Sequence, residues 1–317
     1  MRRLLALPLV FLLLGVNAFA EEDITASLTP AAREMPLPST TPSYKELGFE
    51  GVHNNEVEVL RQKYLTTHKD WLYDMLDDAE PYRIYVRNQL EMKNLPPILE
   101  YLPMVESDYI PTAKSKSGAT GMWQFMLNSI KPFLKCDEYI DERLDQWKST
   151  DAALAKLSDN YTMFNDWLLA ITAYNCGAGA LRRIIKKAGE SDFWYLRRNG
   201  FLSEQASGYV PKLLAIADVC ENAAFYGVEM PTARDESGET LAIRAGLFDY
   251  VVVKKSIALD VLSSELRMDE DVLKRLNLAL VKGMTPPHSE YALRFPEGMK
   301  LSAIHALERL ESYSQED

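Results

Sequence analysis

The sequence predicts a mainly α-helical protein that ends in a small α+β unit. Apolar residues recur at three- and four-residue spacing through most of residues 56–228, which is typical of amphipathic helices. Beyond residue 245, two β-branched or aromatic runs flank two short helical segments, an order typical of a small α+β unit. At roughly 150 residues per domain, the 317-residue chain has room for about two domains.

The composition is that of an ordinary globular protein and argues against two kinds of site. The chain has 35 Lys and Arg against 46 Asp and Glu, a formal net charge of -11. This negative balance offers no field that would attract a phosphate backbone, so we expect no nucleic-acid partner. Three scattered cysteines and four histidines without paired spacing predict neither a disulfide scaffold nor a metal site.

Residues 1–20 have the pattern of a secretory signal peptide. Two arginines precede the apolar run 4–16, and Ala-Phe-Ala at 18–20 has the small residues of a cleavage site. The run is shorter than the roughly twenty residues of a membrane span, although an uncleaved anchor is the alternative. We therefore expect a protein exported to the periplasm or cell envelope.

Four further segments follow the signal peptide. Residues 21–55, rich in Pro, Ser and Thr, predict a linker, and 56–228 a helical domain with a helical lead. A second linker is expected at 229–245, and the α+β module with its terminal helix at 246–317.

The apolar spacing within 56–228 predicts a succession of helices. The stripe over 57–76 predicts the first, and Pro81 is placed to start a second over 82–92. Gly177 is the expected C-cap of a later helix. The other expected helices are 96–107, 121–131, 150–164 with an N-cap at Thr150 or Asp151, 166–175, 178–188 and 204–226. In the module we expect strands at 250–253 and 291–295 and helices at 257–267, 269–276 and 301–310.

The densest cluster of unusual residues lies at 104–125. Glu106 ends the largely apolar segment 99–105, so we expect its carboxyl at the inner end of a helix, where desolvation raises its pKa. A carboxyl poised near neutrality suits general-acid cleavage of a glycosidic bond. The alternative is an ordinary capped or salt-bridged helix end.

Small and aromatic residues follow Glu106. Gly118 and Gly121 allow a backbone to approach a ligand closely. Trp123 and Phe125 offer ring faces for sugars, and Gln124 offers an amide that donates and accepts. Together these residues indicate a carbohydrate site.

The motifs, taken in order, resemble the soluble-lytic-transglycosylase-type domain of bacterial murein transglycosylases. The chain has E-S at 106–107, A-x-S-x-x-G-A-x-G-x-x-Q at 113–124, A-Y-N-x-G at 173–177 and a final Tyr209. With Leu-Pro-Pro at 95–97, the sequence also resembles the membrane-bound lytic murein transglycosylase D branch.

The resemblance implies a goose-lysozyme-like helical fold with one catalytic carboxylate, Glu106. Such a domain cleaves the β-1,4 bond between N-acetylmuramic acid and N-acetylglucosamine in peptidoglycan, with a 1,6-anhydromuramyl product. Tyr209 is implied to reach toward Glu106 and orient it, and Ser107 to hold the local backbone. The implied substrate-binding residues are Ser115, Gln124, Tyr174, Asn175 and Tyr209.

The resemblance also sets the expected partners and the alternatives. The partner is the peptidoglycan glycan strand, while cell-wall assembly proteins and the oligomeric state stay open. No cofactor is expected, because the scheme needs only a carboxyl and the substrate's own hydroxyl. The alternatives are a lysozyme-like hydrolase and a non-catalytic peptidoglycan-binding protein.

The C-terminal module resembles a LysM-like glycan-binding unit. Leu276-Asn277 supports this likeness, whereas the glycine-aspartate-threonine signature of such units is missing near its start. A packing appendage without a ligand is the alternative, because likeness of fold alone does not establish a site.

Overall fold

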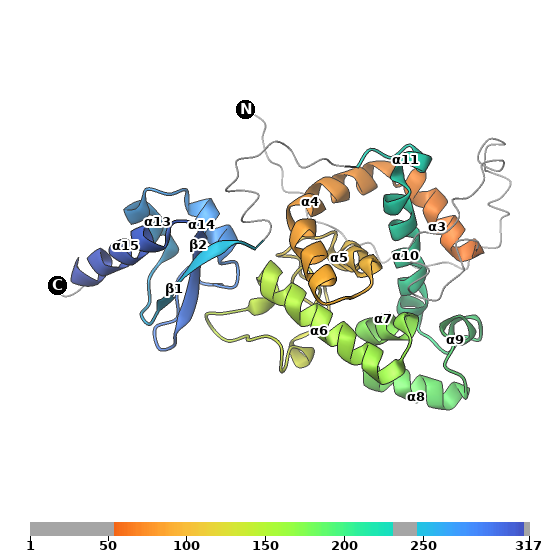
Figure 1. Cartoon of the computed structure of the whole chain (residues 1–317). Helices are drawn as coiled ribbons and strands as arrows, with labels where there is room; N and C mark the ends of the chain where they lie inside the picture. The colour runs from red at the N-terminus through yellow and green to blue at the C-terminus, as the bar shows by residue number, and fades with distance from the viewer. Residues whose placement is uncertain (1–53, 231–245, 314–317) are drawn as a thin grey trace. The chain divides into compact units, whose positions relative to one another are not determined.

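The computed structural model describes residues 54–230 and 246–313. The expected signal peptide, nearly all of the first expected linker and most of the second lie outside these residues. Within the described ranges, no helix combines the length and apolarity needed to cross a bilayer. The described chain is mainly helical with one two-stranded sheet near its C-terminal end, which confirms the predicted fold class (Figure 1).

The first two helices are α3 (Asn55–Leu65) and α4 (Lys69–Met92). The predicted boundary at Pro81 is wrong, since α4 continues through that position and the break lies at residues 66–68. The break begins at Thr66, which has φ -123° and ψ -88°, and the hydroxyls of Thr66 and Thr67 donate to the carbonyls of the preceding turn, at 2.6 and 3.5 Å. Such bonds compete with regular helical geometry.

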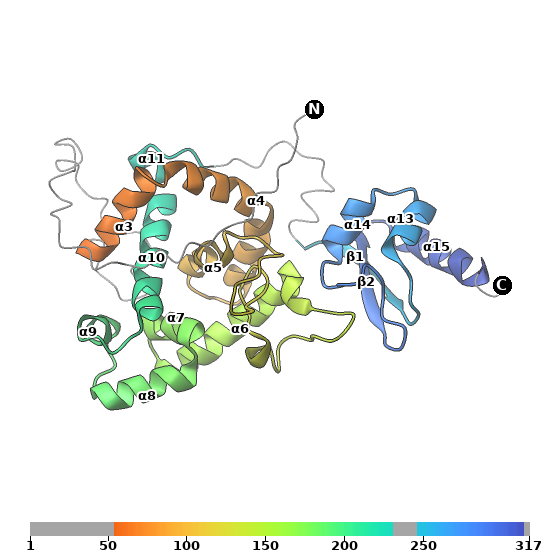
Figure 2. The ribbon, with the colours of Figure 1, turned by 180° about the vertical axis from the view of Figure 1, so that it is seen from behind.

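The predicted helix over 96–107 is present in two parts. A 3₁₀ turn, η3 (Pro97–Tyr101), leads directly into α5 (Leu102–Ser107). Leu99, Leu102 and Met104 are buried, so this segment is anchored in the core. Figures 1 and 2, seen from opposite sides, both place α5 among α4, α6 and α10.

The helix predicted over 121–131 is wrong. This stretch consists of turns and one short 3₁₀ segment, η4 (Leu127–Ser129). Gly121 has φ +86°, and a Cβ built there would lie 1.8 Å from the carbonyl oxygen of Arg143. The backbone of Thr120 pairs with that of Phe125, with the Thr120 amide donating to the Phe125 carbonyl at 3.1 Å. The small residues therefore form a tight loop and do not start a helix.

Three helices follow, after the 3₁₀ turn η5 (Glu142–Leu144): α6 (Gln146–Phe164), α7 (Trp167–Cys176) and α8 (Ala178–Ala188). The N-cap expected at Thr150 or Asp151 is wrong, because the Asp145 side chain accepts from the amides of the first turn of α6. Gly177 is the C-cap of α7, as predicted, with φ +86°. It also joins α7 directly to α8.

The last helices of the first core are α9 (Phe193–Arg198), α10 (Glu204–Glu221) and α11 (Ala223–Tyr226). Helix α9 was not predicted from the sequence, and α10 and α11 were predicted as one helix over 204–226. Of these, α10 is the most deeply enclosed, with twelve of its eighteen residues buried. Its Asp218 forms a buried ion pair with Arg61 of α3 at 2.5 Å, which ties the beginning of the described chain to this helix.

The C-terminal unit has the expected order of elements (Figure 2). Strand β1 (Phe248–Val253) pairs antiparallel with β2 (Tyr291–Pro296), with Val251 opposite Leu293. Helices α13 (Leu259–Leu266) and α14 (Glu270–Leu276) lie between the strands in sequence, and α15 (Lys300–Tyr313) follows them. A second apolar core includes Leu262, Leu273, Leu293 and Phe295.

Candidate active site

The end of α5 fixes the position of Glu106. The two residues after Ser107, Asp108 and Tyr109, both have left-handed φ values, 53° and 63°, so the chain turns sharply just beyond the helix. The buried Ser107 hydroxyl donates to the Met122 carbonyl at 2.7 Å. Ser107 therefore holds the backbone beside Glu106, in the manner expected from the sequence, and its hydroxyl is occupied.

Glu106 and Tyr209 meet across 103 positions of sequence. The Tyr209 hydroxyl, on α10, donates to Oε1 of Glu106 at 2.5 Å. Tyr209 is only 4% exposed, and Glu106 is half-buried at the edge of the core. Burial raises the pKa of Glu106 to about 7, although the Tyr209 hydrogen bond and the charge of Lys156 both lower it. A carboxyl with this pKa is available both as an acid and as a base near neutral pH.

Lys156 of α6 is the residue of this site that the sequence reasoning missed. Its half-buried side chain places Nζ 5.1 Å from the ring centroid of Tyr174 and 5.4 Å from that of Phe125. Cation–π contacts of this kind are worth about 0.5–2 kcal/mol, depending on exposure. Nothing in the local sequence distinguishes Lys156 from other helical lysines. Its position in the site depends on the packing of α5, α6 and α7 against one another.

Tyr174 joins the same cluster from α7. Burial, and secondly the charge of Glu106, raise its pKa well above the ordinary value. Its hydroxyl donates to the Trp123 carbonyl at 2.8 Å, so this phenol is engaged with the backbone and presents its ring to Lys156. The structure therefore brings together three of the residues predicted for the site, Glu106, Tyr174 and Tyr209.

The expectation that Trp123 and Phe125 offer exposed ring faces to sugars is wrong. Their side chains are 0% and 2% exposed. The Trp123 indole donates to Thr150 Oγ1 at 2.9 Å, and Phe125 packs edge-to-face on Tyr174 with centroids 6.1 Å apart. Both rings are core residues that support the loop over 110–145.

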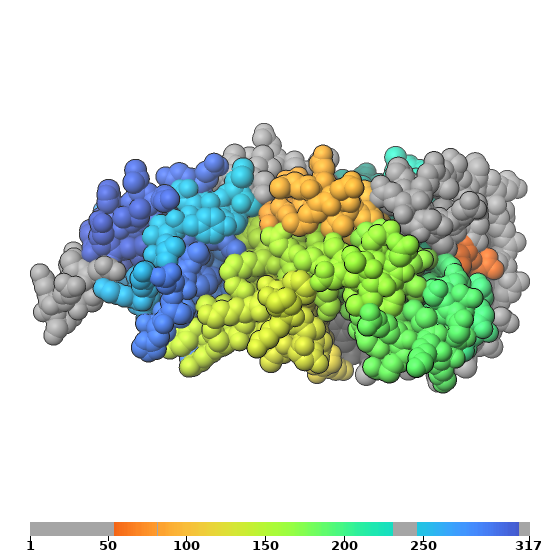
Figure 3. Space-filling model, turned by 60° about the horizontal axis from the view of Figure 1, so that its bottom comes forward, coloured from red at the N-terminus to blue at the C-terminus, as the bar shows by residue number. Residues whose placement is uncertain are grey.

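The remaining predicted residues lie on that loop and at the end of α7. The half-buried Gln124 donates to the Gly121 carbonyl at 2.8 Å, and Ser115 Oγ accepts from the Ala119 amide at 3.0 Å. These side chains shape the loop. Asn175 is half-buried near the C-terminal end of α7. In Figure 3 the loop (yellow to yellow-green) and the segment that includes α8 and α9 (green) lie on the same face.

No second carboxylate acts on Glu106 within the described part of the chain. The nearest acidic residue in sequence, Asp108, accepts from the Trp71 indole at 3.4 Å. The same ranges contain no group of three or more His, Cys, Asp or Glu side chains that could hold a metal ion. Cys136, Cys176 and Cys220 are all free thiols.

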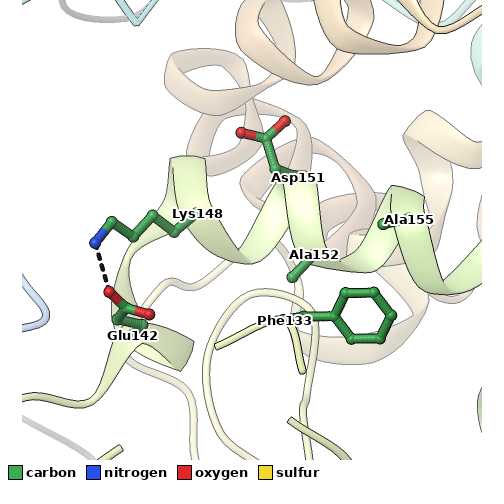
Figure 4. Close-up of a pocket in the computed structure, with 6 residues that line it drawn as sticks. All are labelled: Phe133, Glu142, Lys148, Asp151, Ala152 and Ala155. Carbon is green, nitrogen blue, oxygen red and sulfur yellow. Dashed lines mark hydrogen bonds and ion pairs between the residues drawn. The ribbon is translucent and has the colours of Figure 1, made fainter. Parts of the chain in front are cut away.

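An open pocket of about 420 Å³ lies along the earlier turns of α6 (Figure 4). Lys148 and Glu142 form an ion pair at 2.5 Å on one side of it. None of the residues predicted for the site lines this pocket. Its lining residues are Phe133, Glu142, Lys148, Asp151, Ala152 and Ala155.

Comparison with known families agrees with the motifs. Residues 85–196 match the family described as "Transglycosylase SLT domain". Residues 247–312 match "Lytic transglycosylase MltD, LysM-like domain". These two matches confirm the resemblance inferred from the sequence, and they cover Glu106 and Tyr174 but not Tyr209.

Individual relatives cover parts of the chain. Membrane-bound lytic murein transglycosylase D of Escherichia coli strain K12 is 38% identical over 190 residues, which are 58% of this chain and 41% of that protein. Peptidoglycan transglycosylase gp16 of Escherichia phage T7 is 33% identical over 124 residues, 38% of this chain and 9% of that protein. The chain thus spans about two fifths of the length of the first relative and less of the second.

A solved structure is also similar at a low level. An inactive mutant of the lytic transglycosylase Slt from Pseudomonas aeruginosa aligns with a TM-score of 0.38 and 20% identity. The alignment covers 47% of this chain and 25% of that protein.

Proposed function

We propose that this protein is an exported lytic transglycosylase that cleaves peptidoglycan glycan strands. The observation that carries the proposal is the Glu106 carboxyl, which has a pKa of about 7 and accepts from Tyr209 at 2.5 Å. Glu106 lies within the segment that matches the SLT domain. The name of the Escherichia coli relative states the same activity, and the apolar leader at residues 4–16 supports export.

The proposed reaction uses the Glu106 carboxyl twice, first as an acid and then as a base. Glu106 protonates the oxygen between N-acetylmuramic acid and N-acetylglucosamine while the bond from that oxygen to the muramyl C1 breaks. The muramyl 6-hydroxyl oxygen then bonds to C1 and returns its proton to Glu106. The product is a 1,6-anhydromuramyl end, and no water is consumed.

Two features of the site support this scheme over a two-carboxylate hydrolysis. Ordinary glycosidases place a second carboxylate within roughly 5–10 Å of the acid, as nucleophile or as base for water. Here the charged or hydrogen-bonding side chains that act on Glu106 are Tyr209 and Lys156. The pKa near neutrality also suits a group that must donate and then recover a proton.

Product analysis tests the proposal. Purified protein and its Glu106→Gln variant are incubated with peptidoglycan sacculi, and the released fragments are analysed by mass spectrometry. We expect anhydromuramyl ends from the parent protein and a loss of at least about 10²-fold in the variant, the usual scale for general acid–base catalysis.

The other possible functions give different products. Reducing muramic acid ends, heavier by one water, would identify a lysozyme-like hydrolase. Glycan binding with no product from either protein would identify a non-catalytic binding protein. N-terminal sequencing of protein recovered from the periplasmic fraction tests export, because the proposed cleavage leaves Glu21 as the first residue.

A further inference from the structure

The inference concerns the ammonium group of Lys156 and rests on the proposed function. Lys156 lies on α6, and its Nζ is held over the rings of Phe125 and Tyr174 at 5.4 and 5.1 Å. Tyr174 in turn is fixed by the hydrogen bond from its hydroxyl to the Trp123 carbonyl. The ammonium is therefore positioned by a rigid aromatic support.

The ammonium and the Glu106 carboxylate interact without forming a direct ion pair. Each acts on the other's charge. Among the described residues they are linked through neighbours, because the Ser107 hydroxyl donates to the Met122 carbonyl and the next carbonyl, that of Trp123, accepts from Tyr174, whose ring centroid lies 5.1 Å from Nζ. Glu106 is thus left free to exchange a proton with a substrate while it stays within the field of a cation. Desolvation lowers the pKa of Lys156, and the charge of Glu106 raises it.

The other titratable groups that face Glu106 are tyrosines. Tyr209 comes from α10 and Tyr174 from α7, and burial raises the pKa of each well above the ordinary value. Both phenols are therefore neutral near pH 7. Among the described residues that act on Glu106, Lys156 is the one that carries a charge.

We propose that Lys156 is a positioning residue that sets the acid strength of Glu106 for both halves of the reaction. While Glu106 holds its proton, the cation makes that proton easier to transfer to the glycosidic oxygen. After the transfer, the cation stabilises the carboxylate until the 6-hydroxyl returns a proton. Without the cation, this carboxyl would be a weaker acid, because the charge of Lys156 lowers its pKa.

The test compares pH–rate profiles of four proteins. The parent, Lys156→Met, Lys156→Arg and Lys187→Met are assayed for release of fragments from sacculi between pH 5 and 9. Lys187 is a matched control, because it is an exposed helical lysine on α8. Circular dichroism and thermal melting check that each variant is folded.

We expect the rate of the parent to fall as the pH rises through about 7, because Glu106 must be protonated to act as an acid. In Lys156→Met this fall should move upward by on the order of one pH unit, the effect of losing an opposite charge nearby. Lys156→Arg should restore the parental position, and Lys187→Met should retain it. An unchanged position in Lys156→Met would overturn the inference, whatever the rate.

A second measurement separates this inference from the proposed function. The pKa of Glu106 in the full-length protein is measured by carbon-13 NMR titration of labelled glutamate carboxyls, with Glu106→Gln to assign the signal. A higher pKa in Lys156→Met than in the parent would support the inference even if no sacculus fragments were released. Equal pKa values in the two proteins would reject the role of Lys156 and leave the proposed activity untouched.

Discussion

Replacing Glu106 by glutamine is expected to stabilise the folded protein at neutral and alkaline pH but not in acid. Burial is the main reason that the pKa of Glu106 is raised from 4.5 to about 7 in the folded protein. The folded state therefore holds a proton that the unfolded chain has already lost between these two pH values. Stability from this group is complete below about pH 4.5 and is lost as the pH rises to about 7.

The size of this loss follows from the same two values. One pH unit corresponds to about 1.4 kcal/mol, so the interval from 4.5 to about 7 corresponds to about 3 kcal/mol of unfolding free energy. Glutamine has a similar shape and does not titrate, so the variant avoids this loss. In a helical domain of this size, about 3 kcal/mol is equivalent to roughly 6–12 °C in melting temperature.

The assay is urea unfolding followed by circular dichroism at pH 4 and pH 8. The unfolding free energy of Glu106→Gln, relative to that of the parent protein, should be larger at pH 8 than at pH 4 by about 3 kcal/mol. Glu91→Gln provides the control, because Glu91 is exposed on α4 and should show nearly the same difference at both pH values. If the Glu106→Gln difference were also independent of pH, the carboxyl would not be desolvated in the way described.

Two further predictions concern Tyr209, which donates to the carboxyl, and Gly121 in the loop over 110–145. Tyr209→Phe removes a hydrogen bond that lowers the pKa of Glu106, so the alkaline fall in rate should move to higher pH, and the rate at pH 7 should drop by roughly tenfold or more. Gly121→Ala should cost about 3 kcal/mol or more in thermal unfolding, because its Cβ would meet the Arg143 carbonyl, whereas Gly118→Ala, with open space, should cost about 1–2 kcal/mol. Equal losses at the two glycines, or an unmoved profile in Tyr209→Phe, would contradict these arguments.

The sequence predicted best those elements whose boundaries depend on local signals. Helix α8 runs over 178–188 as expected, because Gly177 both ends α7 and allows the left-handed turn that starts α8. The boundaries of the strands of the C-terminal unit were also predicted to within two residues, since β-branched and aromatic runs are distinctive.

Elements that depend on distant contacts were predicted poorly. The apolar spacing over 121–131 predicts a helix, but Gly121 has φ +86° and the backbone of Arg143 occupies the space where a side chain would lie, so this segment forms a loop. The N-cap of α6 is Asp145, several residues before the predicted position, because the first turn buries the polar Gln146 and Ser149 beside Trp147 and so shows no clear apolar stripe. Motif order indicated Glu106 and Tyr209, whereas only the packing of three helices reveals Lys156.

The burial of α10 limits which substitutions could shift the pH optimum of this protein. Tyr209 shares its helix with eleven other buried residues, so substitutions around the phenol also alter the interior and should reduce the yield of folded protein. By contrast, Lys156 on α6 is partly exposed to solvent. Variants selected for activity in more alkaline or more acidic media should therefore accumulate their changes on α6 and leave α10 largely intact.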